Sequence, residues 1–237
     1  MDKHDIVYFL KDTFYNEELR FSLRSVERNF PHARVIFAGG CPRGFKPDLH
    51  IELEQSRFET KWDNVSSNIK QVCENDDISE NFFLFNDDFF ILKPVKNWNC
   101  NCYNGDLEKL SKQIIENNND KTSRYVLRLN DAQKALEEKG YTIKNFELHC
   151  PMLINRKKML KILDDFGADT PAKRSLYGNV YYAEESGRAC KDHKIVNPKD
   201  EIRPNSWFVS TEDTAFRIGK IGLSLRKDFN GRSRFEI

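Results

Sequence analysis

Long hydrophobic runs and an excess of charge of one sign are both missing from this chain of 237 residues. No apolar stretch approaches the ~18 to 20 residues that a membrane-spanning helix needs. The first apolar run covers only residues 6–10 and is followed by charged residues, which is unlike a secretory signal. Because 38 Lys and Arg residues face 37 Asp and Glu residues, the chain is less basic than a general nucleic-acid binder. We therefore expect a cytoplasmic protein without a membrane span.

The cysteine pattern excludes the common structural zinc sites. The six cysteines include no CxxC pair, and Cys100 with Cys102 forms only a lone CxC. Tetrahedral zinc needs more ligands than that spacing supplies. We expect reduced thiols, as is usual in the cytoplasm.

The first forty residues read as one strand-helix-strand unit. Residues 5–10 form a short apolar run typical of a strand buried on both faces. Asn16 is a candidate cap for a helix in which apolar residues recur at spacings of four and three. A second strand is expected at 34–38, closed by two glycines. Strands that alternate with an amphipathic helix predict an α/β fold with a mostly parallel central sheet flanked by helices.

The pattern continues to the end of the chain without a linker, so a single domain is expected over 1–237. Helices are predicted at 63–74, 106–117, 131–139 and 155–166, and from Thr170-Pro171 onward. Strands are predicted at 81–92, 124–129, 150–154 and 207–210. A basic helix, from 211 onward, is the expected C-terminal elaboration.

Asp87 and Asp88 interrupt the most apolar part of the sequence. They follow Asn86 between the runs 82–85 and 89–92, and two acids in such a setting are costly to bury unpaired. At the carboxyl end of a parallel strand they would face the crevice where α/β proteins bind ligands. Oxygen ligands suit Mg²⁺ or Mn²⁺, which can bridge a diphosphate. The alternative interpretation is an Asn-Asp-Asp turn in a hairpin.

Three segments carry a family resemblance. The stretch FLFNDDFFILKPV at 83–95 resembles the second conserved region of the Stealth family, the capsular-polysaccharide phosphotransferases. The upstream stretch SLRSVERNFPHARVIFAGG at 22–40 is similar to a helix and strand of that family. The segment from Glu147 to Pro151, which contains His149, is similar to its H-x-P segment.

The resemblance implies a GT-A-like fold, in which Asn86-Asp87-Asp88 takes the role of the DxD motif and holds Mn²⁺ or Mg²⁺. Residues 1–95 would then form the half that binds metal and nucleotide sugar, and 96–237 the half on the acceptor side. The expected function is a metal-dependent glycosyltransferase that uses a nucleotide-sugar donor. A Stealth-like hexose-1-phosphate transferase and a non-catalytic binding module remain alternatives. The compact size is also similar to that of phage-encoded transferases, some of which decorate modified bases in phage DNA.

Five further residues are candidates for the site. His149 is a candidate third metal ligand or general base, because histidine side chains commonly serve in both roles, and Glu147 is the alternative base. Asn64 and Asn68 share one helix face, preceded by Lys61, in a region that borders the donor sugar in a GT-A fold. For each of these residues a purely structural role is the competing interpretation.

Two more groups are candidate donor contacts. Asp12 follows the first strand, where a nucleotide base or ribose would lie. Arg226 and Lys227 belong to a local basic cluster near the C-terminus, which could neutralise a donor diphosphate or hold an acceptor such as DNA. The family resemblance implies a polysaccharide acceptor as the alternative. The basic cluster can also be interpreted as a solvent-exposed charged surface with no binding role.

Overall fold

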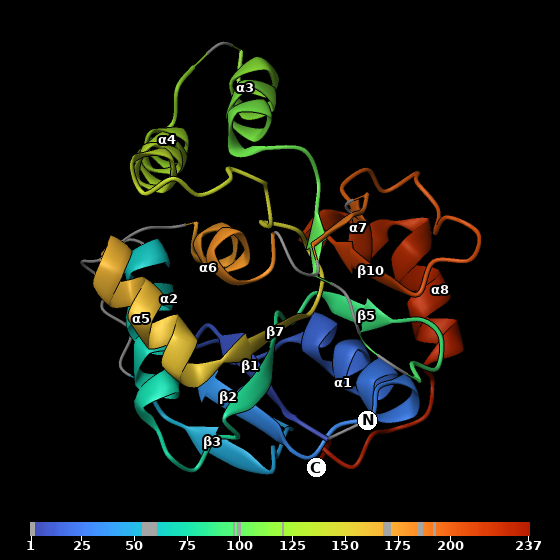
Figure 1. The fold of residues 1–237 in the computed structure, drawn as a ribbon. Coiled ribbons are helices and arrows are strands. Elements are labelled where there is room, and N and C mark those ends of the chain that lie inside the picture. Colours follow the sequence, from blue (N-terminus) through green and yellow to red (C-terminus); the bar gives the residue numbers. More distant parts are fainter. Residues whose placement is uncertain are drawn as a thin grey trace.

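The computed structural model describes residues 3–53, 61–96, 98, 101–119, 121–167, 172–183, 187–191 and 193–237, with only the backbone at 61–63. A five-stranded sheet with the order β3-β2-β1-β4-β7 forms the centre of the fold (Figure 1). The first four strands are parallel neighbours, and β7 is antiparallel to β4. Its strands are β1 (Asp5–Leu10), β2 (Val35–Gly39), β3 (Leu49–Ile51), β4 (Asn81–Phe85) and β7 (Met152–Asn155). The predicted α/β class with a mostly parallel central sheet is confirmed.

Helices cover both faces of this sheet because the strands are apolar on both sides. Ile6 and Tyr8 of β1 pack with α1 (Glu17–Asn29), whereas Val7 between them packs toward the opposite face. That opposite face is covered by α2 (Lys61–Glu74), α5 (Arg156–Phe166) and α6 (Lys173–Tyr181). Because successive side chains of a strand point to opposite faces of the sheet, each strand contributes residues to two separate hydrophobic cores.

A second layer lies beside α1. It is a three-stranded sheet with the order β5-β10-β9, in which β10 is antiparallel to β5. Its strands are β5 (Phe89–Ile91), β9 (Lys194–Ile195) and β10 (Phe208–Thr211). The C-terminal helices α7 (Asp213–Ile218) and α8 (Lys220–Asp228) follow β10, and Phe216 of α7 stacks on Phe90 of β5.

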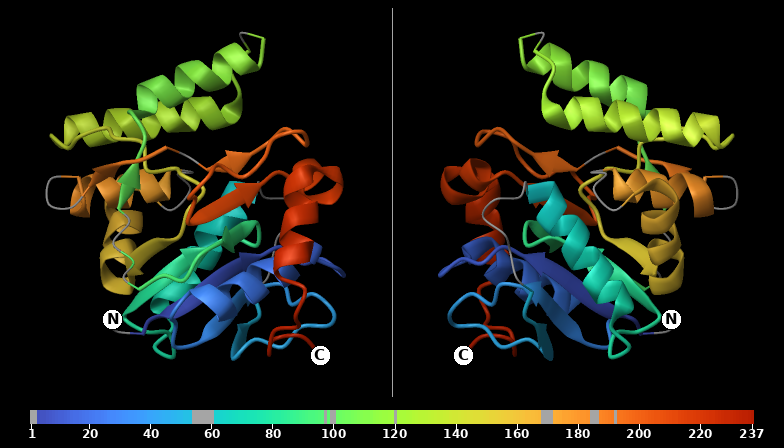
Figure 2. Two further views of the ribbon diagram at one scale, coloured as in Figure 1. Left: turned by 90° about the vertical axis from the view of Figure 1, so that its right-hand side faces the viewer. Right: turned by 90° about the vertical axis from the view of Figure 1, so that its left-hand side faces the viewer.

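A helical hairpin lies at one end of the molecule, away from the central sheet (Figures 1 and 2). It consists of α3 (Leu107–Asn117) and α4 (Arg124–Glu138). Residues 124–129, predicted as a strand, are instead the first turns of α4. Ser123 caps this helix, and Val126, Leu129, Ala132 and Leu136 are buried at spacings of three and four. The helical spacing of these apolar residues therefore decides the structure, and the prediction of a strand at 124–129 from its alternating pattern was wrong.

The other boundaries follow the sequence pattern with three exceptions. The strand predicted at 81–92 is divided by a turn into β4 and β5, which belong to different sheets. The predicted C-terminal helix is divided into α7 and α8, because Gly219 closes the first helix and precedes the second. The predicted start of a helix at Thr170-Pro171 lies outside the described residues. In the part of the chain that the structure describes, no helix combines the length and apolar character needed to span a membrane.

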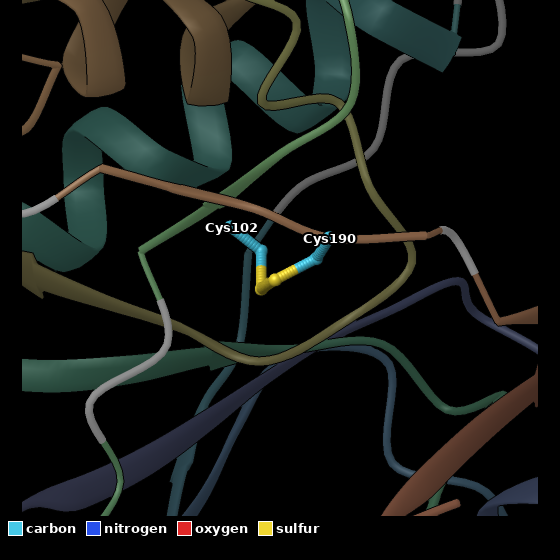
Figure 3. The surroundings of a disulfide bond; sticks show 2 residues. All are labelled: Cys102 and Cys190. Atoms are coloured by element: carbon cyan, nitrogen blue, oxygen red, sulfur yellow. A yellow bond between two sulfur atoms is a disulfide. The ribbon is translucent and has the colours of Figure 1, made fainter.

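A disulfide joins Cys102 to Cys190 across a separation of 88 residues (Figure 3). It joins β6 (Cys102–Tyr103) to the residue directly after β8 (Arg188–Ala189), and these two short strands pair in parallel. The expectation of reduced thiols was wrong for this pair, because the fold brings together two cysteines that no local spacing connects. Since disulfides persist in oxidising compartments, the cysteines give no support to a cytoplasmic location.

Candidate functional site

Asp87 and Asp88 lie in a turn directly after β4, at the carboxyl end of the strand. The turn is marked by the hydrogen bond from Phe89 N to Asn86 O, 3.3 Å. It does not close a hairpin, because β4 pairs with β1 and β7 whereas β5 pairs with β10. The two aspartates therefore sit where the chain passes from the central sheet to the second layer.

The N-terminus of α1 holds Asp87 in place. Asn16 caps this helix by accepting a hydrogen bond from Leu19 N, 2.9 Å. Its Nδ2 donates to Asp87 Oδ2 at 2.6 Å. Burial raises the pKa of Asp87, the Asn16 amide opposes this, and the charge of Asp88 adds to the rise. The net result is a pKa above the ordinary value, which a cation beside the carboxylate would lower again.

Asp88 is held by β10. Its Oδ2 accepts a hydrogen bond from Ser210 Oγ at 2.8 Å. Its Oδ1 is buried and has no hydrogen-bond partner among the described residues. A buried carboxylate oxygen without a donor is costly, and a bound cation would satisfy it. Asp87 and Asp88 thus fit the oxygen ligands of Mn²⁺ or Mg²⁺.

A third carboxylate lies close to the pair. Glu18, in the first turn of α1, accepts a hydrogen bond from Thr211 Oγ1 at 2.8 Å. Burial and, secondarily, the charges of Asp87 and Asp88 raise the pKa of Glu18 to about 7, although the Thr211 hydrogen bond lowers it. This residue was not among the site candidates from the sequence, because an acid in the first turn of a helix is explained by the helix dipole alone.

A cavity of about 300 Å³ opens beside Asp87. Glu147, Lys173 and Arg174 contribute charged groups to its lining, and α2 contributes Val65. The cavity therefore joins one of the predicted aspartates to one of the two predicted bases. It also brings in two cations that the sequence reasoning missed. No local signal could have found Lys173 and Arg174, because α6 reaches this edge only through the packing of the fold.

Glu147 is anchored at the start of α6. Its Oε1 accepts a hydrogen bond from Ser175 N at 2.8 Å. Burial raises the pKa of Glu147, and the Ser175 amide and the positive charge of Arg174 only partly offset this. Around Glu147 the chain is not a strand, so Glu147 and His149 take different neighbours.

His149 lies near β9 rather than in the cavity. Its Nε2 is 3.5 Å from Lys194 Nζ, and Lys194 also pairs with Glu212 at 3.1 Å. Among the described residues, no three His, Cys, Asp or Glu side chains form a group that could hold a metal ion. His149 therefore does not complete such a group with Asp87 and Asp88.

The remaining predicted donor contacts lie after β1 and on α2. Asp12 is exposed immediately after β1. Asn64 is half-buried on α2, and Asn68, one turn on, is buried with its Oδ1 unpartnered among the described residues. The side chain of Lys61 lies outside the described residues.

The basic residues near the C-terminus are mostly engaged within the fold. Arg226 forms a bidentate pair with Glu17 of α1, with both nitrogen–oxygen distances at 2.9 Å. Arg234 forms a similar pair with Asp48 at 2.7 Å. Lys227 is exposed on α8. The cluster is thus largely neutralised by acids brought to it by the tertiary structure.

Comparison with known proteins gives only distant likenesses. No family model matches the chain, and no curated protein matches it. Among solved structures, the galactosyltransferase LgtC in complex with donor and acceptor sugar analogues is 11% identical, with a TM-score of 0.48, covering 97% of this chain and 96% of that one. An active-site mutant of LgtC is 12% identical over 98% of this chain and 85% of that one, with a TM-score of 0.42.

A third solved structure is the glycosyltransferase GlyE of Streptococcus pneumoniae TIGR4, at 10% identity and a TM-score of 0.36. That alignment covers 81% of this chain but only 46% of GlyE. None of the three likenesses reaches a TM-score of 0.5, so the function of this chain has to be argued from its own residues.

Proposed function

We propose that this protein is a metal-dependent glycosyltransferase of GT-A type, which moves a sugar from a nucleotide-sugar donor to a carbohydrate acceptor. The observation that carries the proposal is the buried Oδ1 of Asp88, which has no hydrogen-bond partner among the described residues and lies beside Asp87 at the carboxyl end of β4. Two aspartates so placed suit a divalent cation that also contacts a diphosphate, because such ions favour oxygen ligands.

The protein's own groups would position the donor. Asn16 and Ser210 fix the orientation of the two carboxylates, so that little reorganisation is needed when the donor binds. Lys173 and Arg174 place positive charge in the adjoining cavity, where it would offset the negative charge of the donor phosphates. When bound, Mn²⁺ or Mg²⁺ supplies electrostatic stabilisation of the departing nucleotide phosphate.

Glu147 is the proposed general base. It lines the same cavity as Asp87, and burial raises its pKa, which suits a carboxylate that must accept a proton from an acceptor hydroxyl. His149 is the less favoured base, because its described neighbour is Lys194 rather than a group of the cavity. Asp12, Asn64 and Asn68 are proposed contacts of the nucleotide and donor sugar.

A carbohydrate is favoured over DNA as the acceptor. A DNA-binding surface needs several free cations to contact phosphates. Arg226 and Arg234 are instead paired with Glu17 and Asp48. In this proposal residues 1–95 hold the metal and most of the donor, and 96–237 supply Lys173, Arg174 and Glu147 together with most of the acceptor side.

The test is donor hydrolysis by the purified chain across a panel of nucleotide sugars, with Mn²⁺, with Mg²⁺ and with EDTA. We expect release of the nucleoside diphosphate that needs the cation and falls by at least about 100-fold in Asp88→Asn. Asp131→Asn, at an exposed position on α4, is the matched control and keeps full activity.

Each other outcome has a defined meaning. Release of a nucleoside monophosphate would identify hexose-1-phosphate transfer instead. Hydrolysis that survives both EDTA and Asp88→Asn would refute the metal role. A melting temperature that no donor raises in the presence of Mn²⁺ would favour a non-catalytic module, because a ligand of the folded state must stabilise it.

A further inference from the structure

A second cavity, of about 470 Å³, shares no lining residue with the cavity beside Asp87. Its wall includes the Cys102–Cys190 disulfide, which fixes the two segments that carry it (Figure 3). Its aromatic part is formed by Trp98, Trp207 and Phe208. The donor machinery described above uses none of these residues.

The aromatic rings form a packed platform. The centroid of Phe208 lies 5.7 Å from that of Trp98 and 4.7 Å from that of His193. Trp207 is 52% exposed, which leaves a large ring available to a ligand. The Trp98 Nε1–H group is buried and has no hydrogen-bond partner among the described residues. Ring faces suit a sugar, which presents apolar C–H faces to them.

The charged side chains that the structure describes in the wall of this cavity include two arginines, Arg188 and Arg203, and no Asp or Glu. Neither guanidinium forms an ion pair with any residue that the structure describes, in contrast to Arg226 and Arg234. Arginine remains protonated and binds carboxylates and phosphates in a bidentate manner. The cavity is therefore suited to an anion.

The cavity is connected to the aspartates through β10. Ser210 donates to Asp88 and Phe208 lines the cavity, and these two residues project to the same face of the strand because they are two positions apart. Two residues along a strand span about 7 Å. A ligand of a few sugar units could therefore extend from the aromatic platform toward the site of transfer.

We propose that this cavity is the acceptor subsite and that the acceptor is an acidic glycan, whose carboxylate or phosphate groups are bound by Arg188 and Arg203 while its sugar rings lie on the tryptophans. The inference rests on the proposed glycosyltransferase function. It adds the chemical class of the acceptor, which the site around Asp87 and Asp88 does not specify.

The test compares two trisaccharides of the same linkage, one of galacturonate and one of galactose, by titration calorimetry with the full chain. We expect the acidic trisaccharide to bind at least about tenfold more tightly, as one or two charged hydrogen bonds imply. The double variant Arg188→Ala with Arg203→Ala removes this preference, and Trp207→Ala weakens the binding of both sugars. Arg124→Ala, at an exposed arginine on α4, leaves both affinities unchanged. Competition by inorganic phosphate or by acetate distinguishes a phosphate from a carboxylate ligand.

Equal affinity for the two trisaccharides, or an acidic preference that persists in the double arginine variant, would overturn the inference. A failure of the proposed glycosyltransferase function would give a different set of results from a failure of the acceptor inference. If donor hydrolysis never depends on metal but the acidic trisaccharide still binds through Arg188 and Arg203, the cavity is a glycan site without transferase activity. If hydrolysis is metal-dependent and the acidic sugar does not bind, only the acceptor inference fails.

Discussion

Asn16 joins the start of α1 to the carboxylate of Asp87, which makes it the sharpest probe of the site. Its Oδ1 caps the helix at Leu19 N, while its Nδ2 donates to Asp87 Oδ2 at 2.6 Å. The change Asn16→Asp keeps the shape of the side chain and its capping oxygen. It replaces the amide donor by a carboxylate oxygen, so that two acceptors, both carrying negative charge, meet at that distance.

The expected cost follows from this geometry. Aspartate caps helices about as well as asparagine, so the capping contribution should hardly change. The lost hydrogen bond to a charged group is worth about 1.5–3 kcal/mol. Repulsion between the carboxylates adds to it until one of them takes up a proton. We therefore expect the free energy of unfolding to fall by at least about 2 kcal/mol, which for a chain of this size lowers the melting temperature by about 4–8 °C.

The assay is thermal and urea unfolding of Asn16→Asp and wild type in EDTA, repeated across pH and with Mn²⁺. The folded-state pKa of the new carboxyl pair is raised, so the folded protein binds the extra proton more tightly than the unfolded chain. The loss of stability is therefore greatest at about pH 8 and shrinks as the pH falls toward about 4. Because the variant has one more carboxylate beside the proposed cation site, Mn²⁺ should raise its melting temperature more than that of wild type.

The matched control is Ser123→Asp, which introduces an aspartate at the cap of α4 where no acidic residue occupies the first turn. It should leave stability nearly unchanged in EDTA and give no additional response to Mn²⁺. Equal stability of Asn16→Asp and wild type in EDTA at high pH would refute the close contact with Asp87. A stability loss that Mn²⁺ does not relieve would argue against a cation at the carboxylates.

Three further predictions concern stability. Burial alone would raise the pKa of Glu236, but hydrogen bonds from Arg24 and the Ser233 amide lower that pKa from 4.5 to about 2. Glu236→Gln should therefore lower the free energy of unfolding by about 2–3 kcal/mol at neutral pH, as measured by urea titration, and this difference should disappear as the pH falls from about 5 to about 2. A Cβ on Gly178 would lie 2.4 Å from the Phe146 ring; Gly178→Ala should therefore lower the melting temperature by overpacking, at about 1–3 kcal/mol, despite the better helix propensity of alanine. Cys190→Ser opens a loop of 88 residues and should lower the unfolding free energy by up to about 4–5 kcal/mol, and dithiothreitol should destabilise wild type but not the variant.

The sequence by itself determined the α/β class with a mostly parallel sheet, the first strand-helix-strand unit, and the place of the aspartates directly after a buried strand. Apolar runs flanked by glycine, proline and capping residues are local signals, and they identified β1, α1 and β2 to within a residue or two. Asp87 and Asp88 were identified as candidates in the same way, because acids between two buried runs contradict the local pattern. The prediction of a strand at 124–129 was wrong because an alternating pattern and a helical pattern of apolar residues cannot be told apart over so few residues.

Tertiary structure alone decided which groups meet at the site. Asn16, Glu18 and Ser210 reach the aspartates from two different elements, and Lys173 with Arg174 reaches the cavity from a third. Each belongs to a stretch whose local pattern is explained by capping, charge or helix packing, so nothing in it indicates a partner 70 or more residues away. The same holds for the disulfide and for the neutralised C-terminal arginines, since long-range pairing depends on how the layers pack and not on spacing along the chain.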